Sequence, residues 1–319
     1  MGGGAAARVN RLRAAILGAL CVGVAATAAW GLAYPQNSPV PSLVRAVSDG
    51  AAVVVLGLLV VPAFDEERHR GGLADRAARP LIVVSAVWTI AELFRLFVGA
   101  AEAAGSSAGR VGVRTTFAFA TDTAGGRAGV VCLAAAAVVC VVALTSPGNA
   151  RPTSTSGVVA VGAAAIGVAG RSLVGHLSES PLGGVAVAVH ALAAALWCGS
   201  LAALVLTVTH RGQWARVLPR FSRVSLICVV VLLVFGMAGA VVTLNSPADL
   251  YDTGYGRVLA AKVIVTMVLI GLGARYRSGW LPAARSHRAT VSVSRVRSRI
   301  ELAIMAIALT LAAALAVTG

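Results

Sequence analysis

Long apolar runs separated by short polar loops dominate this chain. Nine runs have the length and composition of membrane spans, at about residues 14–33, 43–63, 81–103, 128–144, 158–175, 185–208, 224–244, 257–275 and 300–318. A helix needs about 20 mostly apolar residues to cross about 30 Å of hydrocarbon. The runs are continuous and do not alternate between apolar and polar residues, so they are not strands of a membrane barrel. The pattern predicts an all-α, polytopic bundle of about nine transmembrane helices.

Composition and charge agree with a membrane protein and predict its orientation. The chain is 58% hydrophobic, and its mean hydropathy of +0.86 is typical of a protein whose main partner is the lipid bilayer. With the N-terminus in the cytoplasm, nineteen arginines fall in cytoplasmic segments and six outside. This asymmetry predicts a cytoplasmic N-terminus and, after nine spans, an extracytoplasmic C-terminus. The basic residues are spread over several short loops, which argues against a nucleic-acid partner.

Few ionisable residues lie inside the predicted spans, and each needs a partner there. Glu92 and Arg95 are three residues apart on one helix, which predicts a structural ion pair. Asp49 and Lys262 lie at similar depth near the outer side, where they can pair across the bundle. Glu301 begins the last run, where we expect it to cap the helix.

Two histidines are the strongest candidates for metal ligands. His176 precedes the sixth span and His190 lies just inside it, so a short turn brings both to the outer rim. Imidazole suits copper, zinc or nickel. Spacing does not choose the completing ligands among Glu179, Asp249, Asp252 and Met237, and a packing role for His190 stays open. The other histidines, His69, His210 and His287, lie in basic loops where we expect them to be solvated.

Several motifs of the second half resemble one known family. The segments GH at 175–176, HALAAALWCGSL, LPRFSRVS, SPADLYDTGYGRVLAAK and RIELAIMAIALTLAAALA follow in the order of the CopD-type copper-resistance family. The resemblance covers about residues 158–319. The first half, with its VWTIAELFRLF segment, is similar to the actinobacterial form, which is often fused to a CtaG-type oxidase assembly domain. We therefore divide the chain into a four-span half, 1–157, and a CopD-like five-span half, 158–319, in one membrane unit.

The resemblance implies a multi-pass protein of the bacterial inner membrane that handles copper ions, commonly as an importer with a periplasmic CopC-type donor. The family's histidines correspond to His176 and His190. Its W-x-G motif corresponds to Trp197 and Gly199, and its YGR…K motif to Tyr255, Gly256 and Lys262. The chain has no Met-rich or His-rich outer segment, so a separate copper donor is expected.

The leading hypothesis is copper uptake through His176 and His190 at the extracytoplasmic face. One alternative is a non-transporting membrane scaffold or cytochrome-oxidase copper-assembly factor that binds oxidase components. A b-type cytochrome fits less well, because only His190 is well inside a span, and we expect no haem. No nucleophile–base spacing or metalloprotease motif occurs, so we do not expect an enzyme.

Overall fold

The computed structural model describes residues 18, 20–34, 39–146, 154–173, 181–243, 246, 248–280 and 291–318. Every regular element in these ranges is a helix, which confirms the predicted all-α class. After an apolar helix at Leu20–Leu32, the main helices are α2 (Val40–Val60), α3 (Arg70–Ala103), α4 (Val113–Asp122), α5 (Ala124–Thr145), α6 (Thr155–Ala169), α7 (Pro181–Thr207), α8 (Arg211–Thr243), α9 (Asp249–Asp252), α10 (Gly254–Arg275) and α12 (Val291–Thr318). The short helices η1 (Val61–Phe64), η2 (Glu67–His69), η3 (Ala108–Arg110) and η4 (Gly170–Leu173) and the π-helix η6 (Tyr276–Trp280) complete the described part.

Seven helices of the described part are long and apolar enough to cross a membrane, and two shorter ones, Leu20–Leu32 and Thr155–Ala169, are also apolar. Each of the nine predicted runs overlaps one of these helices. The structure thus confirms the positions of the apolar helices, while the number of spans stays a prediction.

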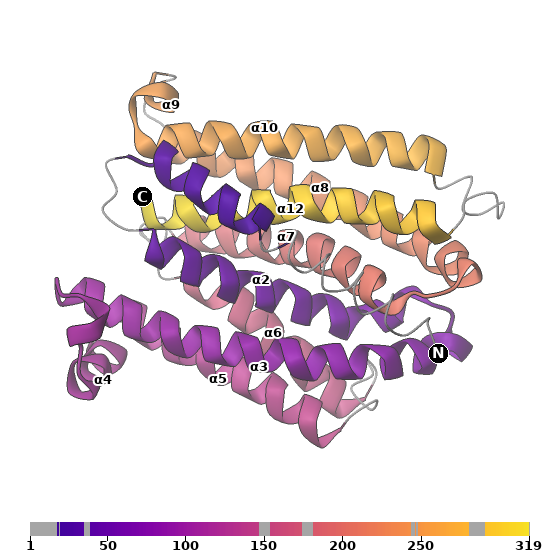
Figure 1. Ribbon diagram of the computed structural model, residues 1–319, viewed down its shortest axis with the longest axis horizontal. Coiled ribbons are helices and arrows are strands. Elements are labelled where there is room, and N and C mark those ends of the chain that lie inside the picture. The colour runs from indigo at the N-terminus through magenta and orange to yellow at the C-terminus, as the bar shows by residue number, and fades with distance from the viewer. Residues whose placement is uncertain are drawn as a thin grey trace.

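Figure 1 shows which connections lie at each end of the bundle. One end holds the α2–α3 and α7–α8 connections with their arginines, and we call it the basic end. The other holds α9 and the end of α12, and we call it the α9 end. Helices α2 and α7 both run from the α9 end to the basic end.

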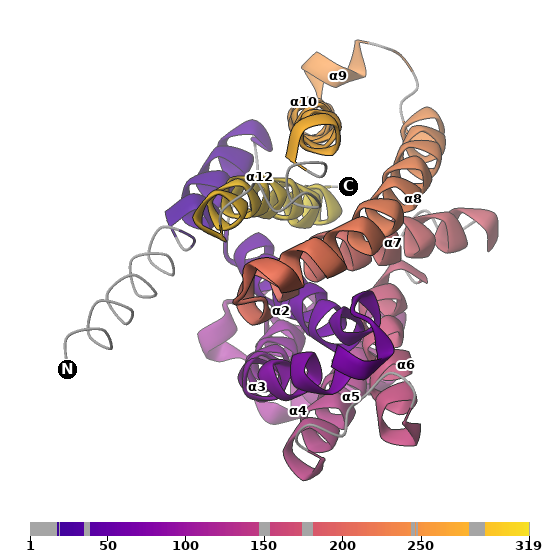
Figure 2. The ribbon, with the colours of Figure 1, turned by 90° about the vertical axis from the view of Figure 1, so that its right-hand side faces the viewer.

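The chain is built from two similar repeats. The first comprises α2 to α6, and the second comprises α7, α8, α9, α10 and α12. In each repeat the second helix is long and contains a proline, Pro80 in α3 and Pro219 in α8. A short helix and then a helix of 22 residues follow in both. The end view in Figure 2 shows α3, α5 and α6 on one side of α2, and α10 and α12 on the opposite side.

The corner between the short and the long helix is the same in both repeats. The sequence reads Asp-Thr-x-x-Gly-Arg at residues 122–127 and again at 252–257. The Thr123 hydroxyl accepts from the Gly126 N–H at 2.9 Å, and Thr253 accepts from Gly256 at 2.9 Å. A Cβ on either glycine would overlap the backbone of the preceding short helix, so only glycine fits.

The long helices α3 and α8 also correspond, with equivalent residues 140 positions apart. Ser85 donates to the carbonyl three residues earlier at 3.1 Å, and Ser225 does so at 3.0 Å. Arg76 and Arg216 are equivalent, and each reaches into the other repeat. Arg76 binds the α7–α8 connection, and Arg216 binds the residue that follows η1. This exchange is what a two-fold axis along the bundle would produce.

Helices α2 and α7 meet at the centre of the bundle, where two glycines allow close packing. A Cβ on Gly57 would overlap the backbone of Gly199, and a Cβ on Gly199 would overlap the carbonyl of Val53. Small residues permit such backbone approach between membrane helices. Ser48 of α2 and His190 of α7 each lie nine residues before the glycine at this crossing. Because the two helices run in the same direction, the two residues lie at the same level in the bundle.

Candidate functional site

His190 is seated against helix α8. A Cβ on Gly236 would lie 3.3 Å from Cε1 and 3.6 Å from Nδ1 of the imidazole, so the ring packs directly on the glycine. The backbone of Leu232 faces the ring, but Nδ1 is buried and forms no hydrogen bond with a described residue. The charge of Lys262, on α10, acts on the same ring. The site therefore offers an unused ring nitrogen close to a lysine.

Among the described residues, none of the other predicted ligands forms a metal-holding group with His190. His176 and Glu179 lie outside the described residues. Asp249 accepts hydrogen bonds from the Ser246 backbone and hydroxyl at 2.9 and 3.2 Å, so it fixes the start of α9. The side chains of Asp252 and Met237 are exposed. Within the described ranges, no group of three or more His, Cys, Asp or Glu side chains is placed to hold a metal.

A buried ion network lies at the level of His190 in the first repeat. Glu92 is 2% exposed and accepts hydrogen bonds from Arg171 at 2.7 Å and from the Ser48 hydroxyl. Arg95 binds Asp49 at 2.8 Å and lies 3.6 Å from Glu92. The predicted Glu92–Arg95 pair is thus confirmed, as one contact of a larger network. The network joins α2, α3 and η4. Removing one of its members would leave a buried charge unpaired, which is costly.

Two predictions about polar residues in the spans are wrong. Asp49 does not pair with Lys262, because Arg95 and Arg45 from its own side of the bundle already bind it. Glu301 does not cap a helix, because α12 begins at Val291 and Glu301 lies buried well inside it. The hydropathy of the preceding turn is lowered by arginines, which placed the predicted start of the helix too late.

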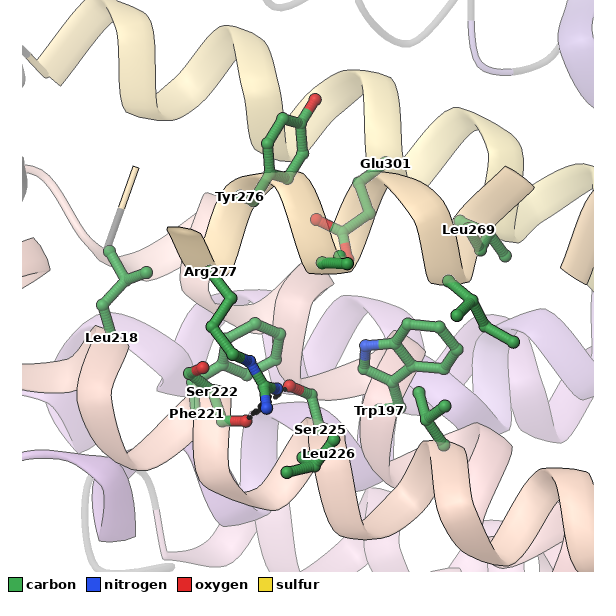
Figure 3. A pocket seen from close by; sticks show the side chains of 14 residues that line it. Trp197, Leu218, Phe221, Ser222, Ser225, Leu226, Leu269, Tyr276, Arg277 and Glu301 are labelled. Atoms are coloured by element: carbon green, nitrogen blue, oxygen red, sulfur yellow. Dashed lines mark hydrogen bonds between the residues drawn. The ribbon is translucent and has the colours of Figure 1, made fainter. Parts of the chain in front are cut away.

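A cavity of about 210 Å³ lies between α7, α8, α10 and α12, in the half of the bundle nearer the basic end. Trp197 and Glu301 line it from opposite sides, and Figure 3 shows both side chains turned toward its interior. Arg277 also lines the cavity, but its guanidinium donates to the carbonyl of Ser222 at 2.8 Å. The cavity therefore combines one carboxylate with a largely apolar wall.

The motif residues of the second half have identifiable structural roles. Trp197 lines the cavity, and Gly199 forms the crossing with α2. Gly256 closes the α9–α10 corner, and Tyr255 lies half-buried in the first turn of α10. The arginine that follows, Arg257, donates to the carbonyls of residues 32 and 34, and so ties the first helix to this corner.

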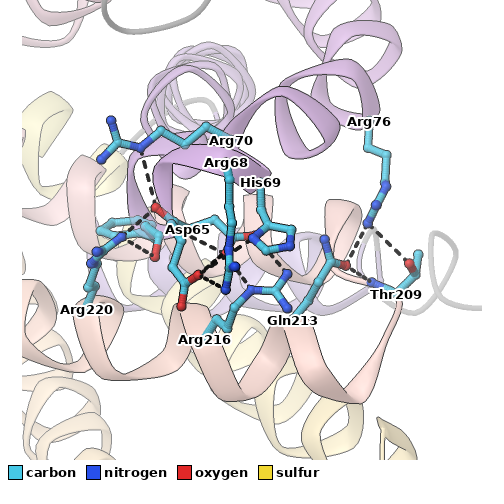
Figure 4. Close-up of polar contacts among 11 residues, drawn as sticks. Asp65, Arg68, His69, Arg70, Arg76, Thr209, Gln213, Arg216 and Arg220 are labelled. Atoms are coloured by element: carbon cyan, nitrogen blue, oxygen red, sulfur yellow. Dashed lines mark hydrogen bonds and ion pairs between the residues drawn. The ribbon is translucent and has the colours of Figure 1, made fainter.

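Asp65 is a buried residue that the sequence did not single out. It is 0% exposed, and its carboxylate accepts two hydrogen bonds from Arg216, at 2.8 and 3.3 Å. Figure 4 shows Arg220 and Arg70 binding its backbone carbonyl as well. Burial raises the pKa of Asp65, but hydrogen bonds from Arg216 and the Glu66 N–H outweigh it and hold the pKa below its usual range. The signal in the sequence was an acidic residue directly after a long apolar run.

Two of the basic-loop histidines lie in the described part. His210 is exposed as expected. His69 is partly exposed, and its Nδ1 lies 3.8 Å from a carboxylate oxygen of Glu66.

The apolar helices, the buried ion network and the intramembrane histidine define a polytopic membrane protein with polar sites inside its helix bundle. Two family models match the chain. The model described as "Copper resistance protein D" matches residues 215–315, and "Copper resistance protein D-like, N-terminal domain" matches residues 37–183. The chain belongs to the copper resistance protein D family, which confirms the resemblance seen in its motifs. No curated protein and no solved structure matches it.

Proposed function

We propose that the protein takes up copper at the α9 end through His176 and His190 and moves it toward the basic end. The proposal assigns the α9 end to the extracytoplasmic side of a bacterial inner membrane. Membership of a copper-resistance family of membrane proteins supports copper as the substrate. The single observation that carries the site is the buried Nδ1 of His190, which no described residue uses.

The surroundings of His190 constrain how copper binds there. Gly236 leaves the imidazole room on the α8 side. Lys262 repels a cation at short range, so the remaining ligands must bring negative charge. Glu179 lies between the two histidines in the sequence and would supply that charge. A donor protein of the CopC type, docked at the α9 end, is a second source.

The test is copper binding by the purified protein in detergent, measured by competition with a chromophoric Cu(I) chelator. We expect the His176→Ala, His190→Ala double variant to bind copper at least about tenfold more weakly, because two imidazole ligands are lost. His210→Ala is the matched control, because His210 is exposed in the α7–α8 connection, and its affinity should equal that of the unmodified chain. Cellular copper should fall in the double variant and not in the control.

Unchanged copper affinity and unchanged cellular copper in the double variant would show that the proposal is wrong. The same preparations separate the alternatives. Co-purification with oxidase subunits without bound copper would indicate an assembly scaffold. A Soret band in the visible spectrum would indicate a b-type cytochrome.

A further inference from the structure

The carboxylate of Glu301 lies inside the cavity without a partner. Glu301 is 4% exposed, and its carboxylate forms no hydrogen bond or ion pair within the described part of the chain. Figure 3 shows the side chain leaving α12 and pointing between Trp197 and Ser225. This arrangement differs from that of Glu92, whose oxygens are bound by Arg171 and Ser48. An isolated ionised carboxylate in an apolar interior is strongly disfavoured, so Glu301 must bind a proton or another cation.

The groups around Glu301 do not neutralise it. The polar and titratable groups near it come from each surrounding element: Trp197 and Cys198 from α7, Ser222 and Ser225 from α8, Tyr276 and Arg277 from η6, and Arg297 from the preceding turn of α12. The two cations are engaged elsewhere. Arg277 donates to the Ser222 carbonyl, and Arg297 lies over the ring of Tyr276 at 5.7 Å.

The chemistry of the cavity favours a proton over a metal ion. A copper ion needs several nitrogen or sulfur donors, and the cavity wall offers one carboxylate, hydroxyls, an indole and the engaged guanidinium of Arg277. The thiol of Cys198 lies near Glu301 but does not line the cavity, so at most one sulfur donor is close. The Ser225 hydroxyl donates its hydrogen to the Ser222 carbonyl at 3.0 Å. Its oxygen is therefore left as an acceptor, which suits a carboxylic acid that donates an O–H.

Comparison of the repeats shows that the positions around the cavity carry different side chains in the first repeat. Phe221, Ser225 and Leu269 line the cavity, and the equivalent residues of the first repeat, Leu81, Ser85 and Val139, are buried. Trp88 of the first repeat is 0% exposed, and a Cβ on Gly167 would overlap its ring. The second repeat has Cys228 at the Trp88 position. The first repeat therefore has a large tryptophan where the second has a small cysteine, and the second contains the cavity around Glu301.

We propose that this cavity is a proton-binding site, with Glu301 as the group that holds the proton at neutral pH. We further assign to Glu301 the proton exchange that accompanies copper movement through the second repeat. This second assignment rests on the proposed function. In this exchange the O–H bond of the carboxyl breaks and the proton passes to water at the basic end. The carboxylate left behind forms a new O–H bond with a proton that enters from the α9 end, and this uptake restores the site for the next copper ion.

The first test is labelling of the full chain in detergent at pH 7 with dicyclohexylcarbodiimide, which adds to protonated carboxyl groups in apolar surroundings. Peptide mass spectrometry should find the adduct on Glu301 and not on Glu92, the buried but arginine-paired control. Glu301→Gln should fold and melt like the unmodified chain, because glutamine mimics the neutral acid. Absence of the adduct on Glu301, or a large loss of stability in Glu301→Gln, would overturn the assignment.

The second test uses proteoliposomes loaded with a pH-sensitive dye. Copper entry should be accelerated severalfold by an inward proton gradient, acidic on the side from which copper enters, in the unmodified protein and not in Glu301→Gln, while copper affinity stays unchanged in both. The same gradient dependence in Glu301→Gln would overturn the coupling. Loss of copper binding in the unmodified protein would instead remove the proposed function, and the labelling result would still decide the proton site.

Discussion

The Asp65 carboxylate shows how one buried acid can join the two repeats. It follows η1 of the first repeat, and both of its oxygens are bound by Arg216 of the second. Removing one partner of such a pair leaves the other without compensation. We expect Asp65→Asn to lower the free energy of unfolding by about 1–3 kcal/mol, because the amide keeps only part of the hydrogen bonding.

The same residue predicts a pH dependence with a definite sign. The pKa of Asp65 is lower in the folded protein than its usual value. Its contribution to stability is therefore complete above about pH 4, the usual range of an aspartate, and is lost as the pH falls through the lowered folded pKa. Unfolding in mixed micelles, followed by circular dichroism between pH 7 and pH 3, measures this loss.

A matched control is Asp75→Asn, because Asp75 is exposed on α3. This variant should follow the pH profile of the unmodified chain, whereas Asp65→Asn should show a flatter one. Identical profiles for both variants would contradict the role given to the Asp65–Arg216 pair.

At the scale of single residues, the sequence predicted contacts within one helix and missed contacts between distant segments. Glu92 and Arg95 share a helix face, so their proximity follows from spacing. Arg171, the closer partner of Glu92, is 79 residues away in the chain. Only the packing of η4 against α5, α6 and α7 brings it there. His176 and Glu179 lie outside the described residues, so their part in the copper site stays a prediction.

At the scale of helices, the crossing of α2 and α7 depends on two glycines. We expect Gly57→Ala to destabilise the protein by about 2 kcal/mol or more, because its Cβ would meet the Gly199 backbone and force the helices apart. Gly50→Ala, on the same helix, is the control. A Cβ there meets nothing within 4 Å, so this variant should be as stable as the unmodified chain or slightly more stable.

Thermal unfolding of the two variants, with the unmodified chain beside them, decides the point. Equal melting temperatures for Gly57→Ala and Gly50→Ala would show that the crossing tolerates a wider separation.

The apolar runs predicted where the helices lie, because length and hydropathy are local properties. They did not predict the starts of helices that extend beyond the apolar core. Helix α12 begins at Val291, before three arginines that lowered the local hydropathy. The short helices α4 and α9 also escaped the pattern, since neither has the length of a span. These errors changed the role assigned to Glu301 from a cap to a buried cavity residue.

At the scale of the whole molecule, the sequence contained a repeat that its hydropathy did not display. The Asp-Thr-x-x-Gly-Arg corners, the paired arginines 76 and 216 and the paired serines 85 and 225 are its visible traces. They are few, and the spacing between them changes from 140 to 130 along the repeat. Only the equivalent hydrogen bonds make the correspondence secure. The division between residues 157 and 158 stays a prediction.

The distribution of arginines predicts which end of the bundle faces the cytoplasm. We expect a cysteine at position 252 (Asp252→Cys) to react with a membrane-impermeant maleimide in intact cells, because α9 lies at the outer end. A cysteine at position 210 (His210→Cys) should react only after permeabilisation. Both positions are exposed, and the five native cysteines are buried or half-buried, so the unmodified chain provides the background. The opposite labelling pattern would reverse the topology and the proposed direction of copper movement.

The buried Trp88 of the first repeat and the cavity of the second should make the two repeats unequally tolerant of substitution. Trp88, Leu81 and Val139 can hardly change without loss of packing, since each is at most 4% exposed. Phe221 and Leu269, the equivalents of Leu81 and Val139, are buried as well, but they line the cavity, so a larger side chain has space there. In a protein built from two similar repeats, this asymmetry lets the second repeat accept substitutions that the first does not tolerate. Differences in metal or ion preference among descendants of this chain should therefore map to the second copy.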